Sequence, residues 1–188
     1  SDRKFLETAE ILAQFLLDKM WDNVGGFVDR VEDKGAFGAL KLADKPLEEN
    51  SVAADAFLRL YHLTGKQKYR YTSKRTLEVF ANTYQGYGIM GAVYGLAVEL
   101  YLNSVQIHIV GAKKDDSTGW LLKESLKTYT PLKAVEVIDP EQDKDRLKVL
   151  GYPASKAPTA YVCSGGKCDS TEDPKKVADL VGGKRRGN

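Results

Sequence analysis

The chain lacks several features that would place it in a familiar class. It has no apolar segment of the kind found in secretory signal peptides, because its N-terminus has the pattern of a charged amphipathic helix. Only two cysteines are present, and in a chain without a secretory signal this points to a reducing compartment. We therefore expect a cytoplasmic protein. The chain starts at Ser1-Asp2 and has no initiator methionine, which predicts a fragment of a longer protein.

Long hydrophobic runs and a strong charge of one sign are also missing. The most apolar stretch, residues 86–102, is shorter than the ~20 residues that a membrane span needs, and it contains Glu99. The 28 basic and 26 acidic side chains give a net charge of +2. The excess lies in a basic tail, residues 183–188. Without a domain-wide basic field, we expect neither nucleic acid nor membrane as a partner.

What the sequence does contain is a change of hydrophobic period near Asn103. Apolar residues recur at helical spacing before it, whereas short β-branched runs alternate with helical stretches after it. This change predicts a helical block over residues 1–103 and a small α/β block over residues 104–182. The expected fold class is therefore mainly α with a small α/β part.

The first block has the pattern of about four helices and a flap. Gly65 is the expected C-cap of the second helix, and Asn50 or Ser51 its N-cap. Residues 26–31 and 36–42 are expected to pair as a β-hairpin flap. The expected helices are residues 3–20, 51–64, 68–83 and 88–103.

The second block has short strands and helices in alternation, which favours a small, mostly parallel sheet. Ser117 is the expected cap of its first helix, and Asp173-Pro174 is the expected start of its last. Residues 141–150 form either a charged linker or a helix. The expected strands are residues 105–110, 133–138 and 159–163, and the other expected helices are residues 118–129 and 173–181.

Cys163 and Cys168 enclose Ser-Gly-Gly-Lys after the last predicted strand. A turn of this length permits a disulfide without requiring one. The spacing differs from that of thioredoxin-like redox sites, and two thiolates fall short of the four ligands of structural zinc. The sequence leaves three alternatives open for the two cysteines: free thiols, a structural or reversible disulfide, and metal or catalytic use. Our overall prediction is that the chain has no metal site and no cofactor.

Three acidic residues are candidates for acid–base chemistry. Glu99 is the one charged residue of an otherwise apolar helix, Glu49 precedes the expected N-cap of the second helix, and Asp29 lies beside Gly25-Gly26. Two carboxylates that face one cleft are what glycoside hydrolysis uses. The alternative is structural, since acidic residues before a helix complement its dipole and Glu99 is close enough to its helix end to reach solvent.

His62 and His108 are isolated in the sequence. Neither has a second metal-ligating residue type at the spacing of one helical turn, so both are interpreted as histidines of the core or its boundary.

Several segments resemble one protein family. Residues 45–54 (KPLEENSVAA), residues 58–69 (LRLYHLTGKQKY) and the stretch from Ala157 through Cys168 to Asp173-Pro174 resemble the C-terminal region of large thioredoxin-domain-containing proteins related to spermatogenesis-associated protein. Residues 21–27 (WDNVGGF) are similar to a loop of six-hairpin glycosidase-like toroids. The resemblance covers most of the chain.

The resemblance implies the last part of an (α/α) toroid of the six-hairpin glycosidase or sugar-epimerase type, followed by a small C-terminal α/β piece. No segment matches the thioredoxin-like domain or its redox motif. The chain departs from the family where Glu49-Asn50 runs directly into Ser51, because many relatives have a Pro-Ser-Gly-Asn insertion there. No catalytic residue is carried over from the family.

Three hypotheses for function follow. The first is a carbohydrate-related, glycosidase- or epimerase-like enzyme with a carbohydrate ligand. The second is a non-catalytic interaction module, because two helical hairpins cannot close a six-hairpin ring. Its exposed helical edge would dock onto the rest of the longer protein or onto a second copy. The third is a thiol-redox accessory domain that uses Cys163 and Cys168.

Overall fold

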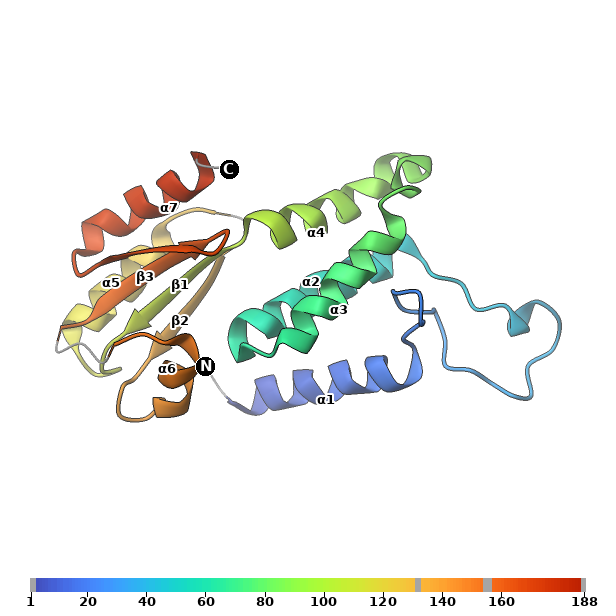
Figure 1. The fold of residues 1–188 in the computed structure, drawn as a ribbon, viewed down its shortest axis with the longest axis horizontal. Coiled ribbons are helices and arrows are strands. Elements are labelled where there is room, and N and C mark those ends of the chain that lie inside the picture. The colour runs from blue at the N-terminus through green and yellow to red at the C-terminus, as the bar shows by residue number, and fades with distance from the viewer. Residues whose placement is uncertain (1–2, 131–132, 154–156, 187–188) are drawn as a thin grey trace. The chain divides into compact units, whose positions relative to one another are not determined.

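The computed structural model describes residues 3–130, 133–153 and 157–186, and the chain divides into two compact units (Figure 1). The first unit ends at Tyr101 and the second begins at Leu102, near the period change at Asn103. Helices dominate the described residues, and the second unit contains a four-stranded sheet. The protein is therefore mainly α with a small α/β part.

The α-helices of the first unit lie close to where the hydrophobic period predicts them. Helices α2 and α3 form a hairpin around Gly65, whose φ of +73° is the left-handed C-cap conformation that glycine adopts most easily. A 3-10 helix over Tyr84–Met90 precedes α4. The helices are α1 (Arg3–Lys19), α2 (Leu47–Thr64), α3 (Gln67–Phe80) and α4 (Gly91–Asn103).

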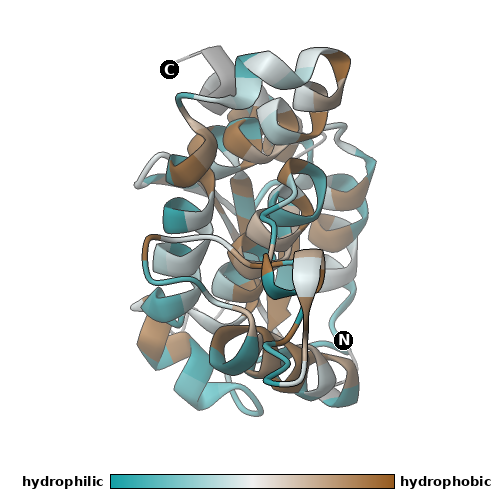
Figure 2. Ribbon diagram, turned by 90° about the vertical axis from the view of Figure 1, so that its right-hand side faces the viewer, coloured by the Kyte–Doolittle hydropathy of each residue, from teal (hydrophilic) through white to brown (hydrophobic). Residues whose placement is uncertain are grey.

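Two buried clusters hold these helices together. One joins α1, α2 and α3 around Phe27, Phe57 and Tyr69, and the other joins α2, α3 and α4 around Leu77, Phe80 and Tyr94. Hydrophobic and hydrophilic stretches alternate along the helices (Figure 2), as expected for helices that bury one face. Several apolar side chains of α1 stay exposed, namely Phe5, Ile11, Leu12 and Phe15.

The segment between α1 and α2 is not the predicted β-hairpin. Its described residues form one isolated bridge, between Trp21 and Phe27, and a 3-10 turn over Gly38–Lys41. Asn50 holds the loop instead: its side chain accepts a hydrogen bond from the Phe27 N–H at 2.6 Å and donates one to the Phe27 carbonyl at 2.9 Å. Helix α2 begins at Leu47, so the prediction of an N-cap at Asn50 or Ser51 is also wrong.

The sheet of the second unit is mixed, with strand order β2-β1-β3-β4. Strand β1 (Val105–Val110) pairs in parallel with β2 (Lys133–Ile138) and antiparallel with β3 (Thr159–Ser164). Strand β4 (Lys167–Thr171) pairs antiparallel with β3. The prediction of a mostly parallel sheet is therefore wrong: β3 runs antiparallel to β1, and a turn as short as Gly165-Gly166 can join β3 to β4 only as an antiparallel pair.

Alternation along the strands separates the two faces of this sheet. Ile107, Ile109 and Val162 point to one face, where α5 (Asp116–Lys127) and α7 (Val177–Arg186) cover them. The other face carries α6 (Lys144–Leu150), which buries Leu147 against Val110 and Ile138 (Figure 1). The candidate site lies on this second face.

The helix ends of the second unit agree in part with those predicted from the sequence. Asp173 caps a 3-10 turn that has Pro174 at its first position and leads into α7, as predicted. Helix α5 is capped by Asp115, which accepts a hydrogen bond from the Thr118 N–H, and not by Ser117. Helix α7 continues to Arg186, so residues 183–186 of the predicted tail are helical, and residues 187–188 lie outside the described residues.

Candidate functional site

The register of three strands brings polar side chains together on the α6 face. His108 in β1 lies directly opposite Glu136 in β2 and Tyr161 in β3. Each of these residues alternates with apolar neighbours that point to the opposite face. A row of three polar side chains therefore crosses the middle of the sheet.

A disulfide between Cys163 and Cys168 continues this face toward the edge of the sheet. The two cysteines are opposite each other in β3 and β4, with an S–S distance of 2.05 Å and a Cα–Cα distance of 4.1 Å. Gly165 and Gly166 close the hairpin with φ values of +57° and +79°, which suit the two-residue turn that favours such pairing. Of the alternatives left open by the sequence, the structure has the disulfide.

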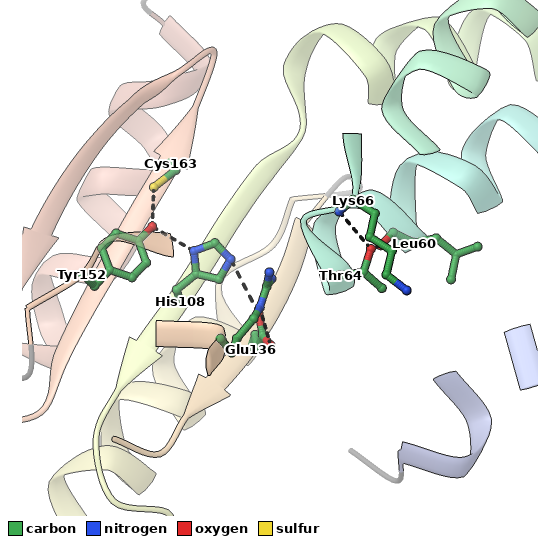
Figure 3. Close-up of polar contacts among 8 residues, drawn as sticks. Leu60, Thr64, Lys66, His108, Glu136, Tyr152 and Cys163 are labelled. Atoms are coloured by element: carbon green, nitrogen blue, oxygen red, sulfur yellow. Dashed lines mark hydrogen bonds and ion pairs between the residues drawn. The ribbon is translucent and has the colours of Figure 1, made fainter. Parts of the chain in front are cut away.

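Tyr152 connects the disulfide to the buried histidine. It follows α6 directly after Gly151, which ends that helix in a left-handed conformation. Its hydroxyl lies 3.3 Å from the Cys163 sulfur and 2.9 Å from Nδ1 of His108 (Figure 3). Its ring stacks on Tyr161 with 4.0 Å between the ring centroids. Packing thus fixes the position of the hydroxyl between a sulfur and an imidazole.

Burial raises the pKa of the Tyr152 hydroxyl above its ordinary value, and the neighbouring Tyr161 raises it further. The hydroxyl therefore keeps its proton at neutral pH. Since a disulfide sulfur carries no proton, Tyr152 is the donor in any hydrogen bond with Cys163.

An ion pair lies at the far end of this chain of contacts. Glu136 accepts hydrogen bonds from Nε and Nη2 of Arg146, the shortest being 2.8 Å. The same carboxylate lies 3.8 Å from Nε2 of His108, whose side chain is 4% exposed. This distance is too long for a hydrogen bond, but it places a negative charge beside the imidazole.

The two cysteines differ in their exposure to solvent. Cys163 is half-buried, whereas Cys168 is exposed on the edge strand β4. The disulfide therefore joins an exposed outer residue, Cys168, to a half-buried inner residue, Cys163, whose sulfur lies next to a hydrogen-bond donor. This asymmetry favours attack of an external thiolate at Cys168 with Cys163 as the leaving sulfur, because the rate of thiol–disulfide exchange depends on access and on how readily the other sulfur leaves.

The three acidic residues predicted from the sequence lie in three different parts of the first unit, namely the loop after α1, helix α2 and helix α4. Asp29 accepts two hydrogen bonds from Arg30 and one from the Asp44 N–H, and these contacts hold its pKa below the ordinary value. Glu49 is exposed in the first turn of α2, and Glu99 is exposed on α4. Glu49 is thus placed to complement the dipole of α2, while a catalytic role for Glu49, Glu99 or Asp29 stays a prediction.

A groove of about 450 Å³ lies elsewhere in the first unit. Its lining includes Trp21, Arg30, Glu32 and Asp33. Neither Asp29, Glu49 nor Glu99 lines it. The carboxylates that do line it are Glu32 and Asp33, which sequence reasoning did not single out.

Sequence reasoning also missed Tyr152, Glu136 and Arg146. The interpretation of His108 as a core residue is confirmed by its burial. Its polar contacts depend on strand register and on the return of the chain after α6, which short-range spacing does not reveal. A usable signal was the polar residue inside each apolar strand, since His108 and Glu136 interrupt runs of β-branched residues.

Within the described ranges, no group of three or more His, Cys, Asp or Glu side chains could hold a metal ion. Helices that are long and apolar enough to cross a membrane are likewise absent from these ranges. No family model, no curated protein and no solved structure matches the chain.

Proposed function

We propose that the second unit exchanges disulfides with external thiols through Cys163 and Cys168. The single observation that carries this proposal is the asymmetry of the disulfide, with Cys168 an exposed residue and the Cys163 sulfur in contact with the Tyr152 hydroxyl. The expected cytoplasmic setting is part of the same proposal, because disulfides in that compartment are mostly transient and serve catalysis or redox sensing.

The exchange begins when an external thiolate attacks the sulfur of Cys168. A bond forms between the external sulfur and Cys168, the Cys163–Cys168 bond breaks, and its electron pair leaves on Cys163. A second external thiolate then attacks the external sulfur of the mixed disulfide and releases Cys168. Two external thiols are oxidised to one disulfide, and the protein disulfide is reduced to two thiols that take up the two protons.

Tyr152 acts on the leaving sulfur. As Cys163 gains negative charge, the Tyr152 hydroxyl donates a hydrogen bond to it, and charged acceptors form the stronger hydrogen bonds. Nδ1–H of His108 can at the same time donate to the Tyr152 oxygen, which requires a protonated or Nδ1-protonated imidazole. Glu136, held by Arg146, then balances a positive charge on His108. His108 and Glu136 are positioning residues, since neither touches a sulfur.

Trapping of the mixed disulfide tests this proposal. The oxidised chain is mixed with reduced glutathione, quenched with an alkylating agent and analysed by peptide mass spectrometry. We expect glutathione on Cys168 and the alkyl group on Cys163. Attachment of glutathione to Cys163, or reaction only after denaturation, would contradict the assignment of the outer and inner sulfurs. The double variant C163S/C168S is the control for non-specific reaction.

A carbohydrate ligand for the first unit is a second proposal. It is supported by the groove lined by Trp21, Glu32 and Asp33, because aromatic rings and carboxylates together can bind the apolar faces and hydroxyls of sugars. The same proposal interprets α1 to α4 as an arc of an (α/α) toroid. Further helical hairpins of a longer protein, or a second copy, would then cover the exposed apolar side chains of α1.

An NMR titration with neutral oligosaccharides separates this second proposal from the first. Binding in the groove predicts a shift of the Trp21 indole signal and no shift of Trp120, which is exposed in the second unit. If neither or both signals move, the groove is not a specific carbohydrate site. The variant E32Q is expected to weaken binding without affecting disulfide exchange.

A further inference from the structure

Strand β4 is an edge of the sheet, and its outer side has no neighbouring strand among the described residues. The strand is five residues long, and all of its side chains except Thr171 are exposed. It contains no proline, and Lys167 and Asp169 are charged. Charged side chains discourage unselective pairing at an edge, but the unpaired backbone groups of the strand can still bind an extended chain of suitable sequence.

The turn of the hairpin determines which backbone groups face this open edge. A two-residue turn makes Ser164 and Lys167 a hydrogen-bonded pair, so the next pair, Cys163 and Cys168, is not hydrogen-bonded. The short Cα–Cα distance of 4.1 Å between the cysteines agrees with this assignment. The N–H and C=O groups of Cys168 therefore point away from β3, and the same alternation applies to Ser170.

We propose that the open edge of β4 binds an extended, polar, cysteine-containing segment of a partner protein as an added strand, and that this cysteine exchanges with Cys168. The inference rests on the proposed exchange function and specifies its substrate. The charged side chains of Lys167 and Asp169 favour a polar segment over an apolar one.

The geometry of strand addition suits the reaction. A partner residue opposite Cys168 would form a hydrogen-bonded pair, with Cα atoms about 5.5 Å apart. This separation falls in the range of ordinary disulfides, so a mixed disulfide can form without displacing either strand. Cys163 lies across β4 from the added strand, and the external sulfur therefore approaches Cys168 from the side opposite the leaving sulfur, as displacement at sulfur requires.

Rates of exchange with two thiols test the inference on the full chain. One thiol is glutathione, which is too short to form a strand, and the other is a seven-residue peptide of threonine and lysine with a central cysteine. We expect the peptide to react about tenfold faster, because two additional backbone hydrogen bonds hold it in place. N-methylation of the peptide amides that face β4 should remove this advantage.

Variants at Ser170 provide the matched comparison. S170P removes the outward N–H while leaving the pairing of β4 with β3 intact, whereas S170A keeps the N–H. We expect S170P to slow exchange with the peptide about tenfold and to leave exchange with glutathione unchanged. S170A should react with both thiols at the rates of the original chain. If S170P slows exchange with both thiols equally, the substitution has changed the hairpin. The rates of the peptide and its N-methylated form with the original chain then test the added strand.

Equal rates for the peptide and its N-methylated form would overturn the inference that the segment binds as an added strand. The proposed exchange function would then still stand. Absence of exchange with either thiol would overturn both.

Discussion

Tyr152 is the residue on which the proposed chemistry depends most. Its hydroxyl is within hydrogen-bonding distance of both the Cys163 sulfur and Nδ1 of His108, and stacking on Tyr161 limits its movement. A single hydroxyl thereby connects a surface disulfide with a buried imidazole.

Removal of this hydroxyl should weaken the reactivity of Cys163. In a chain with C168S, the added change Y152F is expected to reduce the alkylation rate of Cys163 at neutral pH by about 10- to 100-fold. This range follows from about 1.5–3 kcal/mol for a hydrogen bond to a charged acceptor. Y161F changes the stacked neighbour and should leave the rate nearly unchanged. Equal rates for Y152F and Y161F would show that the Tyr152 hydroxyl has no role.

His62 makes the stability of the first unit depend on pH. It is 5% exposed in α2, and this burial lowers its pKa to about 4. The positive charges of Arg59 and Arg70 also lower the pKa, whereas the negative charge of Asp55 raises it. Between about pH 6.5 and 4 the unfolded chain binds a proton at His62 that the folded chain does not. Stability is therefore fully present above pH 6.5 and falls as the pH is lowered toward 4.

Urea unfolding measured from pH 7 to 4.5 checks this effect. We expect a loss of up to about 3 kcal/mol from His62 alone. The variant H62Q should show a shallower dependence on pH, because glutamine at position 62 does not titrate in this range. If the original chain and H62Q lose stability in parallel, the effect comes from other groups.

At the scale of elements, predictions succeed where apolar period alone determines structure. Strands β1 and β2 were predicted with their observed bounds, because each is a run of β-branched residues. Strand β4 was missed because its residues are polar and exposed on both faces, which leaves no hydrophobic period to detect. The candidate site was predicted only at its two cysteines, since the contacts of Tyr152 and Glu136 require knowledge of strand register.

The loop between α1 and α2 was wrongly predicted for a different reason. Gly25 and Gly26 have positive φ values, and a Cβ atom on Gly25 would lie 2.8 Å from the Arg75 carbonyl oxygen. Close approach to α3 and the side chain of Asn50 therefore determine the path of this loop. A propensity for hairpins does not capture such long-range contacts.

Asn50 can be tested directly. The change N50A leaves the buried N–H and C=O groups of Phe27 without this partner, and we expect a loss of about 2 to 4 kcal/mol in the free energy of unfolding. N23A, at an exposed position in the same loop, is the control and should change stability by less than about 0.5 kcal/mol. Similar losses for both variants would mean that Asn50 is not what holds the loop.

For the whole molecule, the main feature is that each buried cluster belongs to one unit. The clusters around Phe57 and Phe80 contain first-unit residues, and those around Ile107 and Ile138 contain second-unit residues. The groove with Trp21 and the disulfide with Tyr152 are likewise in different units. The two proposed functions can therefore be tested separately in one chain.

Hydrogen exchange of the intact chain should reveal this separation. L121A creates a cavity beneath β1 and β3, and a loss of about 2 to 5 kcal/mol is expected. We predict that amides of the second unit lose protection while those of the first unit keep it. L126A on the exposed side of the same helix should have little effect. Equal loss of protection in both units would contradict the prediction.

In the folded protein, we propose, the Cys163–Cys168 disulfide exchanges with external thiols. The most direct test of this exchange is a redox titration of the intact chain in glutathione buffers, with the oxidised fraction counted by mass spectrometry after acid quenching. We expect a midpoint within the range of cellular redox couples, about −180 to −260 mV. A disulfide that stays fully oxidised below about −300 mV, as structural disulfides do, would contradict it.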